Sequence, residues 1–208
     1  LSARRFDRLP ESDWTVLVQS VNHHLPHIAD ILWRFDFLPF ARLDDLMISY
    51  APPGGTVGPH FDSYDVFLLQ VGGKKRWQIS GQEDIRLVEG APIKILQSFE
   101  ADQTWEVNHG DLLYLPPKYA HYGVALEPGM TYSIGFRAPS AGEVLTHFTD
   151  FLAQFIPEDE RYSDAGCAPA SEHPAEIPPE AIERLRGLMK RHLSDDRLLL
   201  AWFGQHMT

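Results

Sequence analysis

Two residues whose types and spacing suit a metal ion lie in the stretch GPHFDSYDVFLLQVGGKKRW (58–77), where one residue separates His60 from Asp62. Side chains at positions i and i+2 of a β-strand point to the same face, so an imidazole nitrogen and a carboxylate oxygen would face a common point. A third ligand must come from a distant segment. The best candidate is His121, which follows a predicted strand and a rigid LPP turn in GDLLYLPPKYAH (110–121).

Two histidines and one carboxylate on one face of a metal ion, with the other positions open, form the arrangement of non-haem Fe(II) oxygenases. Zinc more often takes three protein ligands and a water molecule in a tetrahedron, and the sequence leaves both metals open. A single His-x-Asp pattern also occurs by chance, so the prediction depends on the matching histidine after a strand. The other histidines are interpreted as surface or structural polar residues: His23, His24, His27, His109 (in a turn), His147, His173, His192 and His206.

A cation that could bind an anion follows the candidate ligands along the chain. Lys75 comes after a Gly-Gly turn, at the beginning of the next predicted strand. If its ammonium is buried near the metal it needs an anion, and a dicarboxylate cosubstrate would supply one. Ser133, in TYSIGF (131–136), could add a hydroxyl to the same carboxylate. The alternative places Lys74, Lys75 and Arg76 at a solvent-exposed hairpin corner and makes Ser133 structural.

The segments that must position these side chains are short β-rich runs between Leu43 and Pro139. Turn sequences separate them: PPGG, GG, EGAP, HGD, LPPK and EPGM. Many short strands with no long helix between them predict a sandwich or barrel, and we expect a mainly β fold, a double-sheet jelly roll. The runs expected as strands are LMISY, VFLLQV, KRWQIS, IRLVEG, IKILQSF, TWEVN, DLLYL, HYGVAL and TYSIGF.

A helical lead-in is predicted before these strands. Residues 11–40 begin with a plausible helix cap, Ser12, and continue with apolar residues at helical spacing. A second short helix is expected around His27 to Phe35. The apolar positions that suggest the first helix are Trp14, Leu17, Val18 and Val21.

Helical spacing returns after Ser140. The expected helices cover residues 142–155, 178–193 and 195–207, with an irregular connection at 157–179. Trp202 and Phe203 are large apolar residues that need cover, either from the barrel or from a second subunit, so a homodimer is a reasonable expectation. The predicted division of the chain is a helical lead-in at 1–42, a jelly-roll domain at 43–140 and a helical region at 141–208.

Length and composition bound the class of protein. The 208 residues suit one compact domain, alone or with a smaller appendage, and the 44% hydrophobic and 23% charged composition is that of a soluble globular protein. No apolar run approaches the roughly 20 residues of a membrane helix, and the N-terminal sequence lacks a signal-peptide core. The single cysteine, Cys167, excludes an internal disulfide and a cysteine-built metal site. We therefore expect a cytoplasmic protein.

The charge balance constrains the partner. A net charge of −11 at pH 7 argues against direct nucleic-acid binding, because phosphate contacts need clustered lysine and arginine. An acidic protein suits a basic partner, although acidic residues also serve solubility. The chain begins with Leu rather than Met, so we expect a fragment, with flanking segments missing at both ends.

Residues 44–139 closely resemble the JmjC-type Fe(II)/2-oxoglutarate oxygenases. The runs DDLMISYAPPGGTVGPHFDSYDVFLLQVGGKKRWQI and GDLLYLPPKYAHYGVALEPGMTYSIGFRAP are similar to the bacterial ribosomal oxygenase branch of this cupin superfamily, and the likeness extends to DWTVLVQSVNH and AWFGQHM. The resemblance implies a double-stranded β-helix with N-terminal helices and a helical dimerisation region, which matches residues 141–208. It also implies a C-terminal winged-helix-like domain that the given sequence does not include.

The resemblance further implies roles for individual residues. His60, Asp62 and His121 would be the iron ligands, Lys75 would bind the distal carboxylate of 2-oxoglutarate, and Ser133 would assist it. Bacterial relatives often have arginine where Lys75 stands. Both cations bind a carboxylate, but only arginine does so through a fixed fork.

The activity that this resemblance implies is hydroxylation of an arginine in a large-subunit ribosomal protein, with Fe(II), 2-oxoglutarate and O2. Asp45 and Met47 share a face of a predicted strand, so Asp45 could pair with a guanidinium whose stem lies against Met47. Tyr64 could stack on the same group. The alternative roles are ordinary ones: a capping aspartate, a core methionine and a tyrosine at the rim.

Two other functions stay open. A metal-dependent cupin isomerase or dioxygenase that acts on a small molecule would share the barrel but would not need Lys75. A non-catalytic cupin-like binding module would use the pocket as a scaffold and act through its dimer face.

Overall fold

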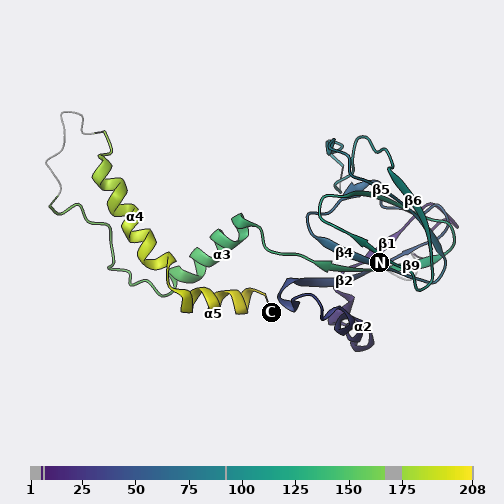
Figure 1. Cartoon of the computed structure of the whole chain (residues 1–208), viewed down its shortest axis with the longest axis horizontal. Coiled ribbons are helices and arrows are strands. Elements are labelled where there is room, and N and C mark those ends of the chain that lie inside the picture. The colour runs from purple at the N-terminus through teal and green to yellow at the C-terminus, as the bar shows by residue number, and fades with distance from the viewer. Residues whose placement is uncertain (1–5, 7, 92, 167–174, 208) are drawn as a thin grey trace. The chain divides into compact units, whose positions relative to one another are not determined.

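The computed structural model describes residues 6, 8–91, 93–166 and 175–207 (Figure 1). The chain divides into two compact units, Leu1–Ala138 and Pro139–Thr208. All strands of the described residues lie in the first unit, together with the predicted lead-in.

The first unit consists of two antiparallel sheets, which confirms the predicted mainly β jelly-roll fold (Figure 1). The five-stranded sheet has the order β1 (Val16–Val18), β2 (Leu43–Ala51), β9 (Gly129–Phe136), β4 (Asp65–Val71) and β7 (Leu112–Leu115). The four-stranded sheet has the order β3 (His60–Phe61), β8 (Ala120–Ala125), β5 (Lys74–Ser80) and β6 (Gln103–Asn108). Sequence-distant strands such as β3 and β8 are therefore neighbours, as a site assembled from separate segments requires.

The almost continuous apolar sequence of β4 reflects a sheet that is covered on both faces. Val66 and Leu68 pack with Trp77 of β5 in the core between the two sheets. Phe67 and Leu69 alternate with them and pack against a second apolar cluster that includes lead-in residues. The alternation of side chains along a strand places these two sets on opposite faces.

The predicted first helix of the lead-in is wrong. Residues Val16–Val18 form the edge strand β1, with Val16 paired to Tyr50 of β2. Asp13 and Ser20 on either side have positive φ angles of 65° and 54°, which a continuing α-helix does not allow. Val16 and Val18 are β-branched residues, which suit a strand. The helical spacing of the apolar residues around them is therefore misleading.

The second predicted helix of the lead-in is present. It comprises α2 (Pro26–Leu32) and the 3-10 turn η2 (Trp33–Phe35), with Pro26 at the first turn. Two further 3-10 turns flank it, η1 (Val21–His23) and η3 (Phe40–Arg42). Ile28 and Leu32 of α2 are buried in the cluster that covers the five-stranded sheet.

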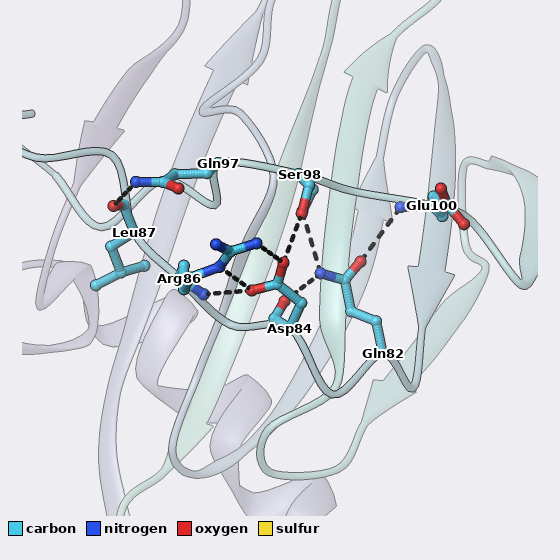
Figure 2. Close-up of polar contacts among 7 residues, drawn as sticks. All are labelled: Gln82, Asp84, Arg86, Leu87, Gln97, Ser98 and Glu100. Atoms are coloured by element: carbon cyan, nitrogen blue, oxygen red, sulfur yellow. Dashed lines mark hydrogen bonds and ion pairs between the residues drawn. The ribbon is translucent and has the colours of Figure 1, made fainter.

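The two strands predicted from IRLVEG and IKILQSF are also wrong. Within residues 81–91 and 93–102 the strand pairing reduces to one bridge between Leu87 and Leu96. Two backbone hydrogen bonds accompany this bridge, from Val88 N to the Ile95 carbonyl at 2.8 Å and from Gln97 N to the Arg86 carbonyl at 2.9 Å. Side chains add further polar contacts: the Asp84 carboxylate accepts from Arg86 Nη2 at 2.7 Å and from Ser98 Oγ at 3.2 Å (Figure 2). Gln82 extends this network, since its Nε2 donates to the carbonyl of Ser98 at 3.1 Å and its Oε1 accepts from the backbone N–H of Glu100 at 3.2 Å (Figure 2).

The second unit contains the helices α3 (Ala141–Ala153), α4 (Pro179–Leu193) and α5 (Asp196–His206), close to the predicted ranges. Ser140 and Glu143 form a complete capping box at the start of α3. Trp202, predicted to need the barrel or a second subunit, is instead covered inside this unit: its ring lies 5.4 Å from that of Phe148 and it is 4% exposed. Phe203 remains 40% exposed.

Part of the connection predicted at 157–179, including Cys167, lies outside the described residues. Its described part, residues 157–166 and 175–178, is irregular. None of the helices among the described residues is long and apolar enough to cross a membrane.

Candidate metal centre

The structure brings His60, Asp62 and His121 to one point. His60 on β3 and His121 on β8 are direct cross-strand partners, and their ring centroids lie 4.2 Å apart. Asp62 follows β3, and its Oδ2 lies 3.7 Å from His121 Nε2. One potential ligand atom from each residue lies within 4.8 Å of the other two. Three side chains from two separate parts of the sequence therefore have the geometry of a metal-binding set.

The backbone fixes which imidazole nitrogen each histidine presents. Nδ1 of His60 lies 2.9 Å from the carbonyl oxygen of Gly58, and Nδ1 of His121 lies 3.0 Å from that of Tyr119. A carbonyl oxygen only accepts, so in both rings Nδ1 carries the proton and donates it. In the neutral form of each ring Nε2 then carries no proton and can serve as the metal ligand.

The electrostatics of the set also suit a cation. Burial, and then the charge of His60, lower the pKa of His121 to about 4, so this imidazole is neutral at pH 7. Burial raises the pKa of the Asp62 carboxyl, while His60 and Lys94 oppose that shift. A divalent cation would stabilise the ionised carboxylate and bind neutral imidazoles. The donor set of two neutral nitrogens and one carboxylate fits Fe(II).

A cavity of about 360 Å³ opens onto these three residues. All eight residues singled out from the sequence line this one cavity: Asp45, Met47, His60, Asp62, Tyr64, Lys75, His121 and Ser133. Its wall also includes apolar side chains of β4, among them Val66 and Leu68. The cavity is therefore large enough for a small organic acid beside the metal ligands.

Lys75 points into the fold, so its alternative placement at an exposed hairpin corner is wrong. It is 7% exposed, and its Nζ lies 4.5 Å from the centroid of the Trp77 ring. Lys74 and Arg76 alternate with it and instead pair with Glu106 at the surface. Burial lowers the pKa of Lys75 to about 8, and no ion pair joins it to a carboxylate of the described residues. A buried ammonium without a carboxylate partner is suited to receive an anionic ligand.

The partner that Lys75 does have was missed from the sequence. Its Nζ donates to Thr131 Oγ1 at 3.2 Å, and the Thr131 hydroxyl donates in turn to Gln70 Oε1 at 3.0 Å. Thr131 lies two residues before Ser133 on β9, so the two side chains share a face. Applied to the candidate Ser133, the period-2 rule could therefore have suggested Thr131 as well.

Trp77 is a further wall residue that sequence reasoning missed. Its Nε1 is buried and has no hydrogen-bond partner among the described residues. A side-chain Cβ at Gly123, directly opposite on β8, would lie 2.5 Å from Trp77 Cζ3 and 2.8 Å from Lys75 Cε. Only glycine at position 123 leaves room for both side chains.

The acidic rim of the cavity depends on a bulge in β2. Leu43 pairs with Phe136 and Leu46 with Ile134, so Asp44 and Asp45 together lie opposite one residue of β9. Both aspartates line the cavity, whereas the period-2 rule predicted Asp45 alone.

Two neighbours of the bulge define the environment of this rim. Asp45 Oδ2 accepts from the backbone N–H of Ser20 at 2.7 Å, which fixes the orientation of its carboxylate. Tyr64 lines the same cavity as both aspartates. Burial, followed by the charges of Asp62, Asp44 and Asp45, raises its pKa to about 12. The Tyr64 hydroxyl is therefore neutral at pH 7 and available for polar contact.

Comparison with known proteins places these residues in a family. The model of the JmjC domain matches residues 30–144. The ribosomal protein uL16 3-hydroxylase of Escherichia coli (strain K12) is 39% identical over 206 residues, which cover 98% of this chain and 54% of the relative. A probable ribosomal oxygenase of Haemophilus influenzae is 40% identical over 151 residues, which cover 70% of this chain and 36% of the relative.

Solved structures give the same result. The structure of YcfD, a ribosomal oxygenase from Escherichia coli, in complex with cobalt and 2-oxoglutarate is 39% identical and superposes with a TM-score of 0.84. The match covers 97% of this chain and 53% of YcfD. The chain thus spans about half the length, or less, of the relatives that it matches.

Proposed function

This chain belongs to the JmjC domain family, and on that premise we propose that it is an Fe(II)- and 2-oxoglutarate-dependent hydroxylase of a ribosomal protein. The observation that carries the proposal is one cavity that holds His60, Asp62 and His121 beside the buried ammonium of Lys75, which has no carboxylate partner in the described part of the chain. The names of the relatives, which include a ribosomal protein hydroxylase and ribosomal oxygenases, support the substrate class.

In this proposal the protein binds and orients the metal ion and the cosubstrate, and the metal supplies the redox chemistry. Nε2 of His60, Nε2 of His121 and the Asp62 carboxylate hold Fe(II), which when bound would use O2 and 2-oxoglutarate to oxidise a C–H bond, with succinate and carbon dioxide as coproducts. Lys75 binds the distal carboxylate of 2-oxoglutarate, and Ser133 assists. The apolar wall of the cavity excludes water from the reacting groups.

We propose an arginine side chain as the hydroxylated group. Asp45 is held by Ser20 with one carboxylate oxygen still available, and Asp44 adds a second carboxylate at the same rim. Carboxylates bind a guanidinium through paired hydrogen bonds, while Met47 and the Tyr64 ring offer apolar and aromatic surface to its stem and plane. The net charge of −11 favours approach of a basic ribosomal protein.

The remaining features of the proposal concern the whole protein. We propose a cytoplasmic homodimer without direct nucleic-acid contacts. The support for a dimer is an exposed apolar face on α4, where Ile182, Leu185 and Met189 are 44%, 45% and 54% exposed. Unpaired apolar helix faces of this kind are typical of subunit interfaces.

Anaerobic titration of the protein with Fe(II) and 2-oxoglutarate tests the activity. We expect a metal-to-oxoacid charge-transfer absorption band in the wild-type protein and its loss in Asp62→Ala. A small-molecule cupin enzyme or a non-catalytic binding module would give no such band.

Mass spectrometry of ribosomal proteins incubated with the enzyme, Fe(II), O2 and 2-oxoglutarate tests the target. We expect a gain of one oxygen atom on an arginine of one large-subunit protein. Modification of a histidine instead would overturn the arginine assignment and leave the reaction class intact.

A further inference from the structure

The Lys75 ammonium begins a series of three side-chain hydrogen bonds in which each group donates to the next. Lys75 Nζ donates to Thr131 Oγ1 at 3.2 Å, Thr131 Oγ1 donates to Gln70 Oε1 at 3.0 Å, and Gln70 Nε2 donates to the carbonyl of Gly72 at 2.9 Å. Lys75, Thr131 and Gln70 are 7%, 2% and 2% exposed. Because the carbonyl of Gly72 can only accept, it orients the Gln70 amide, and the amide orients the Thr131 hydroxyl.

The backbone around this series is built to hold it. Gln70 and Thr131 are direct cross-strand partners on β4 and β9, so their side chains meet on one face of the sheet. Gly72 has a φ of 73°, in the left-handed region that favours glycine, and a Cβ at Gly129 would lie 3.2 Å from Gln70 Nε2. The turn after β4 and the start of β9 thus fix Gln70 from two sides.

The consequence for Lys75 is a fixed position. A lysine side chain has four rotatable bonds and lacks the planar guanidinium of arginine. By itself it therefore does not fix the position of a bound carboxylate within the cavity. Thr131 Oγ1 takes one of its three N–H groups, and the Trp77 ring lies 4.5 Å from Nζ on another side. The remaining N–H groups are directed by these two contacts.

We propose that Gln70 and Thr131 are positioning residues that hold the Lys75 ammonium at one distance from the metal ligands and so determine the length of oxoacid that the site accepts. This inference rests on the proposed function, because it assigns the ammonium to the distal carboxylate of an oxoacid.

Calorimetric binding of oxoacids to the Co(II)-loaded protein tests the inference. The probes are 2-oxoglutarate, the shorter oxaloacetate, the longer 2-oxoadipate, and pyruvate, which has no distal carboxylate. We expect Thr131→Val to weaken 2-oxoglutarate binding by roughly tenfold, since it removes a hydrogen bond to a charged group. Co(II) and pyruvate binding should not change, and preference for 2-oxoglutarate over the longer and shorter acids should fall.

Matched variants separate positioning from damage to the core. Thr131→Ser keeps the hydroxyl and should restore both affinity and length preference, whereas Gln70→Met should reduce the preference with Thr131 intact. Ser80→Ala removes a buried hydroxyl of β5 that does not line the cavity and contacts the Asp102 carboxylate and the Gln82 N–H, so it should leave the preference unchanged. A ratio of affinities within one sample is insensitive to a fraction of misfolded protein.

The outcomes distinguish this inference from the proposed function. Wild-type protein that binds no 2-oxoglutarate in the presence of Co(II) overturns both. Wild-type binding together with an unchanged length preference in Thr131→Val, or with an equal loss of pyruvate binding, overturns the positioning role and leaves the proposed function standing.

Discussion

At the scale of single residues, the site contains a charge that costs the protein stability. Burial lowers the pKa of Lys75 from 10.5 to about 8, a shift equivalent to about 3 kcal/mol between its charged and neutral forms. At pH 7 the ammonium is still protonated, so the folded protein carries this cost in full. Contact with the Trp77 ring offsets only part of it.

Replacement of this lysine should therefore stabilise the protein while it removes cosubstrate binding. We expect Lys75→Met to raise the free energy of unfolding at pH 7 by about 1–3 kcal/mol, because an apolar side chain of similar length replaces a buried charge. The same variant should bind 2-oxoglutarate at least about a hundredfold more weakly, with little change in metal affinity. Urea denaturation and calorimetry measure the two effects.

The control for this prediction is Lys74→Met, one residue earlier and on the exposed face of β5. It should change stability by no more than about 0.5 kcal/mol. Equal loss of metal and 2-oxoglutarate binding in Lys75→Met would indicate general damage to the site and contradict the prediction.

The same pKa predicts how affinity and stability depend on pH. Binding of 2-oxoglutarate needs the ammonium, so affinity should be constant below pH 8 and should fall about tenfold per pH unit above it, until the raised pKa of the complex is reached. For stability the folded pKa lies below the unfolded value of 10.5. The advantage of Lys75→Met is therefore complete below pH 8 and disappears as the pH rises to 10.5.

Titrations across pH 7 to 10 measure both dependences, with Lys75→Arg as the comparison, because its guanidinium stays protonated throughout. A wild-type affinity that does not change between pH 7 and 10 would show that the lysine ammonium does not bind the acid.

The residues of the site differ in how well the sequence reveals them. His60, Asp62 and His121 are residue types that bind metal ions, and their positions on or beside predicted strands already predict that they converge. Thr131 and Gln70 are ordinary polar residues whose role depends on a partner in another strand. Such pairs become visible only when the strand register is known, because a shift by one residue reverses every side chain.

At the scale of elements, β8 packs closely against the Trp77 and Lys75 side chains of β5, and this close approach requires glycine at position 123. We expect Gly123→Ala to lower stability by about 1–3 kcal/mol, since its Cβ would lie 2.5 Å from a rigid indole and 2.8 Å from Lys75 Cε. It should also weaken 2-oxoglutarate binding more than metal binding, because the displaced groups lie on the cosubstrate side. Thermal unfolding and calorimetry measure these losses.

Gly187→Ala provides the matched control. Nothing lies within 4 Å of a Cβ at this glycine of α4, so alanine should stabilise the helix by roughly 0.5–1 kcal/mol. A Gly123→Ala protein as stable as wild type would mean that β8 shifts without cost and that the close approach is not required.

The elements also show where sequence patterns succeed and fail. Strands buried on both sides, such as β4, were predicted from continuous apolar sequence. The segment at 81–102 contains two short apolar runs as well, yet among the described residues these pair only through one bridge between Leu87 and Leu96, beside a polar network around Asp84. Trp14, Leu17, Val18 and Val21 match a helical spacing, but four positions are too few to define a helix, and Val16–Val18 form a strand instead. Both errors arise where tertiary contacts, rather than local sequence, select the structure.

At the scale of the whole molecule, the acidic balance and the acidic rim act in the same direction. In the proposed function, the net charge of −11 would attract a basic partner over a distance of about a Debye length, and Asp44 and Asp45, which line the cavity, would contact it directly. Sequence composition predicted the attraction. It could not predict that a strand bulge places two carboxylates, rather than one, at the rim.

The last prediction concerns the proposed dimer. The α4 helix has no buried residue within the described chain, although Ile182, Leu185 and Met189 lie on one side of it and, together with Leu193, line an apolar groove. Burial of such side chains contributes about 1.5–3 kcal/mol each. We expect the wild-type protein to be a dimer and Leu185→Asp combined with Met189→Asp to be a monomer, because two carboxylates would have to be buried in the interface.

Sedimentation velocity over a range of concentrations measures this change. Glu183→Ala, in which a 68% exposed side chain outside the apolar groove is removed, should remain dimeric. Both variants should bind Co(II) and 2-oxoglutarate as the wild type does, since those ligands belong to the first unit. A double variant that stays dimeric would place the interface elsewhere, and a monomeric wild type would mean that the exposed α4 face does not mediate self-association in this chain.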